Sequence, residues 1–101
     1  MNTAHLKNIQ PEPIVEYIRQ LVQIPSPTGF THHIQDFLLE NARSKKIACS
    51  QKKKGAVLYA FEKDPRSKRI MLCCHVDTLG AMVKNIQKEK IKIAPIGRAH
   101  V

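Results

Sequence analysis

The chain has 101 residues, 43% of them hydrophobic and 25% charged, and it carries a formal net charge of +9. This composition is typical of one small globular domain and excludes an intrinsically disordered chain. The first twenty residues lack the apolar core of a signal peptide, and no apolar run reaches membrane-spanning length, so we expect a cytoplasmic protein without a membrane partner. The three cysteines are odd in number, which argues against a disulfide framework and favours small apolar core residues: Cys49, Cys73 and Cys74.

The basic excess is concentrated in short clusters, at residues 43–46, 52–54, 66–69 and 88–90. Such clusters can attract nucleic acid or an anionic membrane surface, so a small, basic, non-enzymatic binding module is one function to weigh. No aromatic residues alternate with the lysines, and no nucleic-acid-binding motif occurs. We therefore interpret the basic clusters as solvated turns and helix ends, and we do not expect nucleic acid as a partner.

The first predicted helix follows an N-terminal arm at residues 1–12. Apolar residues recur at helical spacing from Pro13, and proline suits the first turn because its missing N–H is no loss there. Pro25 and Pro27 end this helix. The connector IPSPTG, residues 24–29, is expected to have a defined shape because its two prolines fix φ.

A second helix is predicted to begin near Thr31, with Thr28 or Thr31 as the N-cap and an apolar stripe made by Ile34, Phe37, Leu38 and Ala42. After Lys46 the apolar period changes to that of strands. Turns are expected at Lys54-Gly55 and Asp64-Pro65. The predicted strands are residues 47–50, 56–61, 69–74, 82–86 and 91–96.

The strand predicted at 69–74 differs from the others because residues 70–74 are continuously apolar. That pattern is typical of a strand covered on both faces, as in α/β proteins. Only two helices are predicted to cover it, which suggests the front part of a larger α/β domain. Unpaired strand edges and an uncovered face near residues 71–73 would make the isolated chain prone to aggregate or dependent on a partner.

His75 ends this apolar run, and Asp77 follows two positions later. Side chains at the carboxyl end of a central strand face the crevice in which α/β proteins keep their sites. A neutral imidazole there can bind a metal ion, and the carboxylate can accept a hydrogen bond from the other ring nitrogen. An isolated His-x-Asp is more often a strand-end cap bonded to nearby backbone. One histidine also cannot hold zinc, because even a catalytic site usually needs three protein ligands.

The segments IPSPTG, KKGAVLYA, IMLCCHVDTLGAMVKNI and IKIAPIG occur in this order, with a helix after the first. The series resembles the N-terminal part of the co-catalytic zinc aminopeptidases of the glutamyl/deblocking type, the tetrahedral aminopeptidases also called cellulase M. The resemblance covers residues 13–97, and HVDTLGAMVKNI is its most specific part.

The resemblance implies the N-terminal portion of a three-layer α/β/α zinc-peptidase domain, truncated before an inserted β-barrel domain. It also implies a metal-dependent aminopeptidase that releases N-terminal residues from peptides. In this family two divalent metal ions, zinc or cobalt, form the site, and the subunits form homo-oligomers. By position, His75 matches the first metal ligand, and Asp77 matches the catalytic-site aspartate that orients it.

The chain also departs from the family pattern. No residue here matches the bridging aspartate, the glutamates or the remaining metal ligands. A second glycine is expected after Ile96-Gly97, whereas residues 98–101 form a divergent tail. We therefore expect the 101-residue chain to be an incomplete catalytic domain and to be inactive by itself, with oligomer formation in doubt.

Overall fold

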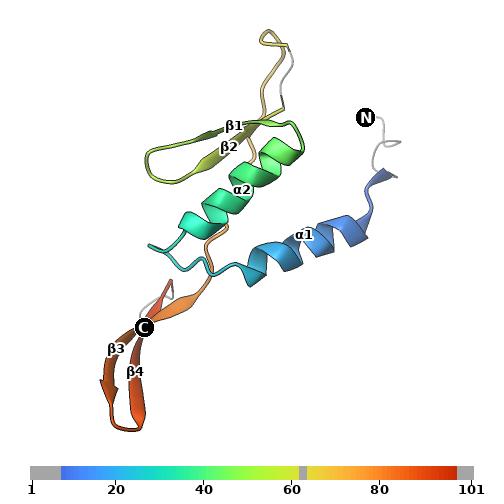
Figure 1. Cartoon of the computed structure of the whole chain (residues 1–101). Helices are drawn as coiled ribbons and strands as arrows, with labels where there is room; N and C mark the ends of the chain where they lie inside the picture. The colour runs from blue at the N-terminus through green and yellow to red at the C-terminus, as the bar shows by residue number, and fades with distance from the viewer. Residues whose placement is uncertain (1–7, 62–63, 98–101) are drawn as a thin grey trace.

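The computed structural model describes residues 8–61 and 64–97. In chain order the elements are α1 (Pro11–Gln23), α2 (His32–Ser44), β1 (Ala48–Gln51), β2 (Val57–Ala60), β3 (Gly80–Gln87) and β4 (Lys90–Ile96) (Figure 1). The strands form two antiparallel hairpins, β1–β2 and β3–β4. The mixture of helices and strands agrees with the expected α/β class, whereas the three-layer arrangement remains a prediction.

Prolines explain both ends of α1, whereas α2 begins without a side-chain cap. Pro11 opens α1, two residues before the predicted start, and Ile24 leaves the helical conformation immediately before Pro25. Thr31 holds the N-cap position of α2, but its side chain makes no capping hydrogen bond. Its hydroxyl instead accepts a hydrogen bond of 2.8 Å from Gln35.

Within the described residues, neither helix is long and apolar enough to cross a membrane.

The small core lies between α2 and the β1–β2 hairpin. Ile34 and Ala42, two residues of the predicted apolar stripe, are fully buried there. The hydroxyl of Tyr59 on β2 donates a hydrogen bond to the backbone carbonyl of Leu38 on α2. The ring of Tyr17 lies 6.1 Å from that of Phe37, measured between centroids, and this contact joins α1 to α2.

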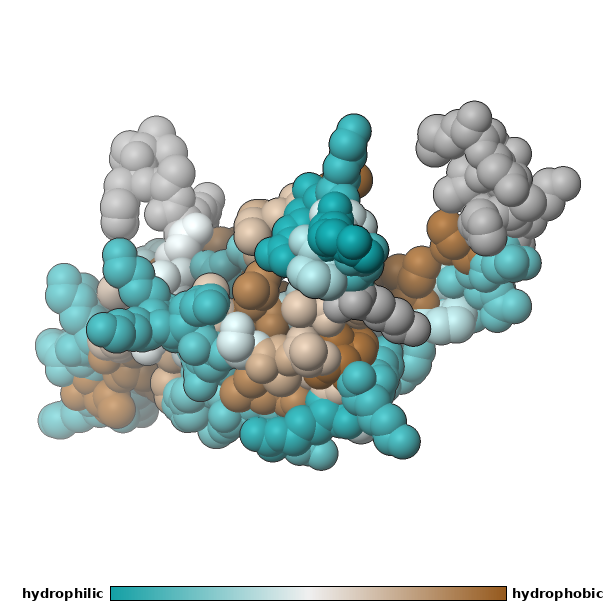
Figure 2. All heavy atoms as spheres, turned by 90° about the horizontal axis from the view of Figure 1, so that it is seen from above, coloured by the Kyte–Doolittle hydropathy of each residue, from teal (hydrophilic) through white to brown (hydrophobic). Residues whose placement is uncertain are grey.

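The chain is much more open than a compact domain of its size. Its radius of gyration is 18.4 Å, whereas about 12.7 Å is expected for 101 residues. Its accessible surface is 9670 Å², against roughly 5,800 Å² for a compact monomer of this mass. The β3–β4 hairpin extends away from α2, at the opposite end from β1–β2 (Figure 1). Apolar side chains consequently lie exposed among polar ones (Figure 2).

The buried strand expected at 69–74 is not formed, so that prediction is wrong for this structure. Residues 69–74 adopt no regular secondary structure, and Ile70 and Leu72 are 88% and 92% exposed. Cys73 and Cys74 are exposed too, so they do not act as core residues. A strand with this composition needs neighbouring strands and a helix on each face, and no strand within residues 8–61 and 64–97 pairs with it.

Candidate functional site

The segment that carries His75 and Asp77 is held against the IPSPTG connector. Pro27 and Thr78 form a parallel β-bridge. The backbone N–H of Thr78 donates a 2.9 Å hydrogen bond to the carbonyl of Ser26. The hydroxyl of Ser26, which is fully buried, donates to the carbonyl of Val76 at 3.2 Å. We call this arrangement of residues 26–28 against residues 76–78 the loop clasp.

Prolines and glycines explain why the chain forms the loop clasp. Pro27 starts a turn that the Phe30 N–H closes with a 2.8 Å bond to the Pro27 carbonyl, and Gly29 supplies the positive φ of 88° within that turn. Gly80 allows close approach from the other side. A Cβ atom on Gly80 would lie 2.5 Å from the Cβ of Pro27, so no larger residue fits without displacing the connector.

His75 and Asp77 are in direct contact. The Nδ1 atom of His75 lies 3.0 Å from Oδ1 of Asp77, and 3.2 Å from the Asp77 backbone carbonyl oxygen. An ionised carboxylate only accepts hydrogen bonds, so in the neutral imidazole Nδ1 carries the proton and Nε2 keeps its lone pair. The His75 side chain is 86% exposed. The pair therefore has the geometry in which a carboxylate sets the tautomer of a metal-binding histidine.

Thr28 completes this group, because its hydroxyl donates a 2.8 Å hydrogen bond to Oδ2 of Asp77. This bond is the main reason that the pKa of Asp77 lies below its ordinary value. Desolvation acts in the opposite direction, and the contact with His75 lowers the pKa further. Asp77 is thus kept in the ionised form that accepts from Nδ1. Sequence reasoning treated Thr28 only as a possible helix cap and so missed this contact.

The residues present fit part of a metal site. Across residues 8–61 and 64–97, no three or more His, Cys, Asp or Glu side chains are grouped so that they could hold a metal ion. His32 and His33 are exposed at the start of α2, with ring centroids 4.0 Å apart. His5 and His100 lie outside the described residues. The arrangement offers one imidazole nitrogen, Nε2 of His75, with the Asp77 carboxylate on the other ring nitrogen.

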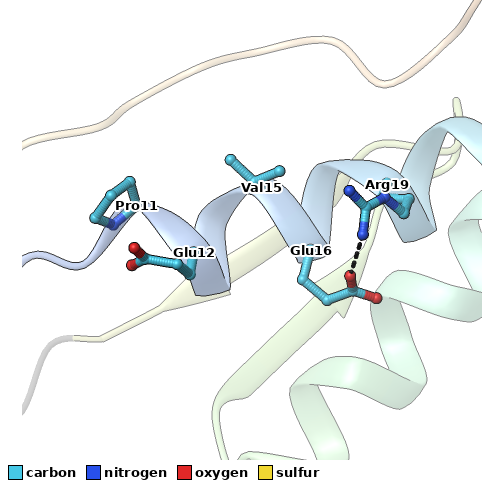
Figure 3. Close-up of a pocket in the computed structure, with 5 residues that line it drawn as sticks. All are labelled: Pro11, Glu12, Val15, Glu16 and Arg19. Carbon is cyan, nitrogen blue, oxygen red and sulfur yellow. Dashed lines mark hydrogen bonds and ion pairs between the residues drawn. The ribbon is translucent and has the colours of Figure 1, made fainter.

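Two surface hollows in the described part of the chain lie away from the His75–Asp77 pair. The hollow in Figure 3 is lined by one helix, α1, and its polar groups include an exposed ion pair of 3.0 Å between Arg19 and Glu16. A second hollow is lined by residues 87–90 at the tip of the β3–β4 hairpin. Neither hollow includes a residue of the loop clasp or a buried polar group, so the His75–Asp77 pair remains the candidate site.

Comparison with known proteins agrees with the resemblance seen in the sequence. Residues 55–101, which include His75 and Asp77, match the family model of the M42 glutamyl aminopeptidases. The chain is 38% identical over 84 residues to the protein named "Putative aminopeptidase YhfE" from Bacillus subtilis (strain 168). That match covers 82% of this chain and 24% of the relative, so the chain spans about a quarter of the relative's length. No solved structure matches. On these two sequence matches, the chain is similar to the M42 glutamyl aminopeptidases over residues 55–101 and to an aminopeptidase-named relative over 84 residues.

Proposed function

We propose that this chain supplies the first metal ligand, His75, and its orienting carboxylate, Asp77, to a metal-dependent aminopeptidase. The proposed substrates are peptides, the reaction is hydrolysis at the N-terminal residue, and the proposed compartment is the cytoplasm. The observation that carries the proposal is the 3.0 Å contact between His75 Nδ1 and Asp77 Oδ1 within the family-matched segment. The match to the family model and the aminopeptidase name of the relative support the reaction class.

The two residues have separate tasks in this proposal. Asp77 accepts the Nδ1 proton of His75 and so fixes both the tautomer and the orientation of the ring. Nε2 is then the nitrogen that binds metal, and zinc or cobalt suits a site built from imidazole and carboxylate groups. When bound, two divalent ions would polarise the scissile carbonyl and activate water. Thr28 and the loop clasp keep Asp77 in place for this role.

The 101-residue chain by itself is proposed to be inactive. A catalytic metal usually needs three protein ligands, and among the described residues no three His, Cys, Asp or Glu side chains are grouped so that they could hold one. In this proposal the remaining ligands lie outside the described residues. Oligomer formation is not proposed for this chain alone.

A chimera tests the proposal. In the YhfE chimera, the 84 matching residues of this chain replace their counterparts in the Bacillus subtilis relative. We expect zinc- or cobalt-dependent release of N-terminal residues from peptides, loss of that release after chelation, and no release by the 101-residue chain alone. His75→Ala should abolish the activity of the chimera.

The matched control is His33→Ala, which removes an exposed histidine at the start of α2. That variant should remain active. A folded His75→Ala chimera that is as active as the His33→Ala chimera would refute the role of His75. An inactive chimera whose melting temperature matches that of an active relative would refute the proposed activity.

The basic binding module remains the second candidate function. Lys52, Lys53 and Lys54 are all exposed in the turn that joins β1 to β2. If these lysines bind nucleic acid, the affinity should fall steeply as salt rises and should not depend on His75. Absence of binding at low salt would exclude this function.

A further inference from the structure

We propose that Thr28 is a positioning residue for His75, and that it acts through the Asp77 carboxylate. This inference rests on the proposed role of His75 as a metal ligand. The Thr28 hydroxyl would not touch metal or substrate. Its task would be to hold Asp77 in the one orientation that keeps a proton on Nδ1 of His75 and a lone pair on Nε2.

Each oxygen of the Asp77 carboxylate has one partner in this arrangement. Oδ1 lies 3.0 Å from His75 Nδ1, and Oδ2 accepts the 2.8 Å hydrogen bond from Thr28. The Asp77 side chain is 40% exposed, so water competes for both oxygens. A hydrogen bond to one oxygen restricts rotation of the carboxylate plane, and therefore restricts where the other oxygen points. Thr28 thus limits the carboxylate to orientations that reach the imidazole.

The backbone that carries Thr28 is held independently of His75. Thr28 follows Pro27, whose φ is fixed and which pairs with Thr78. Threonine is β-branched, so its χ1 angle is more restricted than that of serine. On the far side, a Cβ atom on Gly97 would lie 3.8 Å from the Thr28 hydroxyl oxygen, so β4 ends close to this group. The position of the Thr28 backbone and the restricted χ1 angle therefore limit where the hydroxyl can lie, without involving His75.

The loop clasp does not depend on that hydroxyl. Its bonds run from the Thr78 N–H to the Ser26 carbonyl and from the Ser26 hydroxyl to the Val76 carbonyl. Replacing Thr28 by valine removes the hydroxyl with little change of shape and leaves both bonds available. A positioning role predicts that Thr28→Val changes the tautomer ratio of His75 but leaves the hydrogen bonds of the loop clasp intact.

The experiment is nitrogen NMR of the imidazole of His75 in the full 101-residue chain without metal, at a pH where the ring is neutral. We compare the parent chain with Thr28→Val, Thr28→Ser and the matched control Thr31→Val. Thr31 also uses its hydroxyl in a side-chain hydrogen bond, but to Gln35 rather than to Asp77. Hydrogen exchange at the Thr78 amide reports in parallel on the loop clasp.

We expect Thr28→Val to shift the equilibrium between the two tautomers away from Nδ1–H by roughly two- to fivefold, the effect of about one hydrogen bond. Thr28→Ser, which keeps the hydroxyl on a less restricted side chain, should restore most of the parent ratio. Thr31→Val should not change it, and Thr78 exchange should be unaltered in all variants. In an Asp77→Asn background, Thr28→Val should have no further effect on the ratio.

Three results would overturn the inference. The first is an unchanged tautomer ratio in Thr28→Val, and the second is an equal change in Thr31→Val. The third is faster Thr78 exchange in Thr28→Val, because the residue would then support the loop clasp rather than orient Asp77. The measurement uses neither metal nor substrate, so failure of the proposed aminopeptidase activity would be seen in the YhfE chimera and not here.

Discussion

Pro27 lies so close to Gly80 that a Cβ atom added to the glycine would be 2.5 Å from the Cβ of the proline. This approach brings the connector against the start of β3 and allows the Pro27–Thr78 bridge to form. The position of the His75–Asp77 segment therefore depends on the absence of a side chain at residue 80.

Replacement of Gly80 by alanine should open the loop clasp. The added methyl group meets a rigid proline ring rather than the end of a flexible side chain, and overpacking of this kind costs about 1–3 kcal/mol. We expect faster hydrogen exchange at the Thr78 amide, whose N–H donates to Ser26 in the parent chain. Combining Gly80→Ala with Pro27→Gly removes the clash, so the double variant should lose less protection than the single variants predict together. Strict additivity would contradict the contact.

Asp77→Asn should weaken metal binding by the YhfE chimera without unfolding it. The amide can still occupy the position of the carboxylate, but it is a weaker acceptor for the Nδ1 proton of His75. Loss of such an outer partner typically costs roughly 10- to 100-fold in metal affinity. The matched control is Asp64→Asn, at an exposed turn whose carboxylate accepts from the backbone N–H of Arg66. Equal affinities for the two variants would refute the orienting role.

The raised pKa of Tyr59 predicts that the free energy of unfolding falls at alkaline pH. Burial, followed by the proximity of Tyr17, raises the pKa of Tyr59 to about 12. An unfolded tyrosine ionises near about pH 10. The protonated phenol therefore favours the folded state fully below about pH 10, and this contribution is lost as the pH rises through about 12. The difference in unfolding free energy between the parent chain and Tyr59→Phe, measured across this window, isolates the effect from lysine titration. A difference that does not vary with pH would contradict the raised pKa.

The exposed apolar residues predict self-association of the isolated chain. Ile70, Met71 and Leu72 are 88%, 71% and 92% exposed, and contiguous apolar surface of this kind is a liability in water. Sedimentation velocity should detect concentration-dependent association of the parent chain, and Leu72→Lys should reduce it. A parent chain that stays monomeric and melts cooperatively would show that this surface needs no partner.

Features that depend on residues nearby in the sequence were predicted correctly, whereas a feature that depends on distant segments was not. α1, α2 and the two hairpins depend on local apolar spacing and on nearby prolines and glycines, and they lie close to their predicted ranges. The strand predicted at 69–74 depends on neighbouring strands and helices, which a local pattern cannot supply.

The same distinction applies to the candidate site. His75 and Asp77 are two positions apart, so their contact could be expected from spacing alone. Thr28 is 49 positions from Asp77, and only the loop clasp brings them together. No local signal at Thr28 distinguishes it from an ordinary cap residue. The positioning group was therefore visible only in the structure.

The measurement that tests the central claim most directly is the zinc affinity of the YhfE chimera, determined by competition with a chelator, with and without His75. If His75 is a metal ligand, His75→Ala should reduce the zinc affinity by more than the roughly 10- to 100-fold expected when only the Asp77 carboxylate is lost. His33→Ala should leave the affinity unchanged. A folded His75→Ala chimera that binds zinc as tightly as its parent would contradict the account.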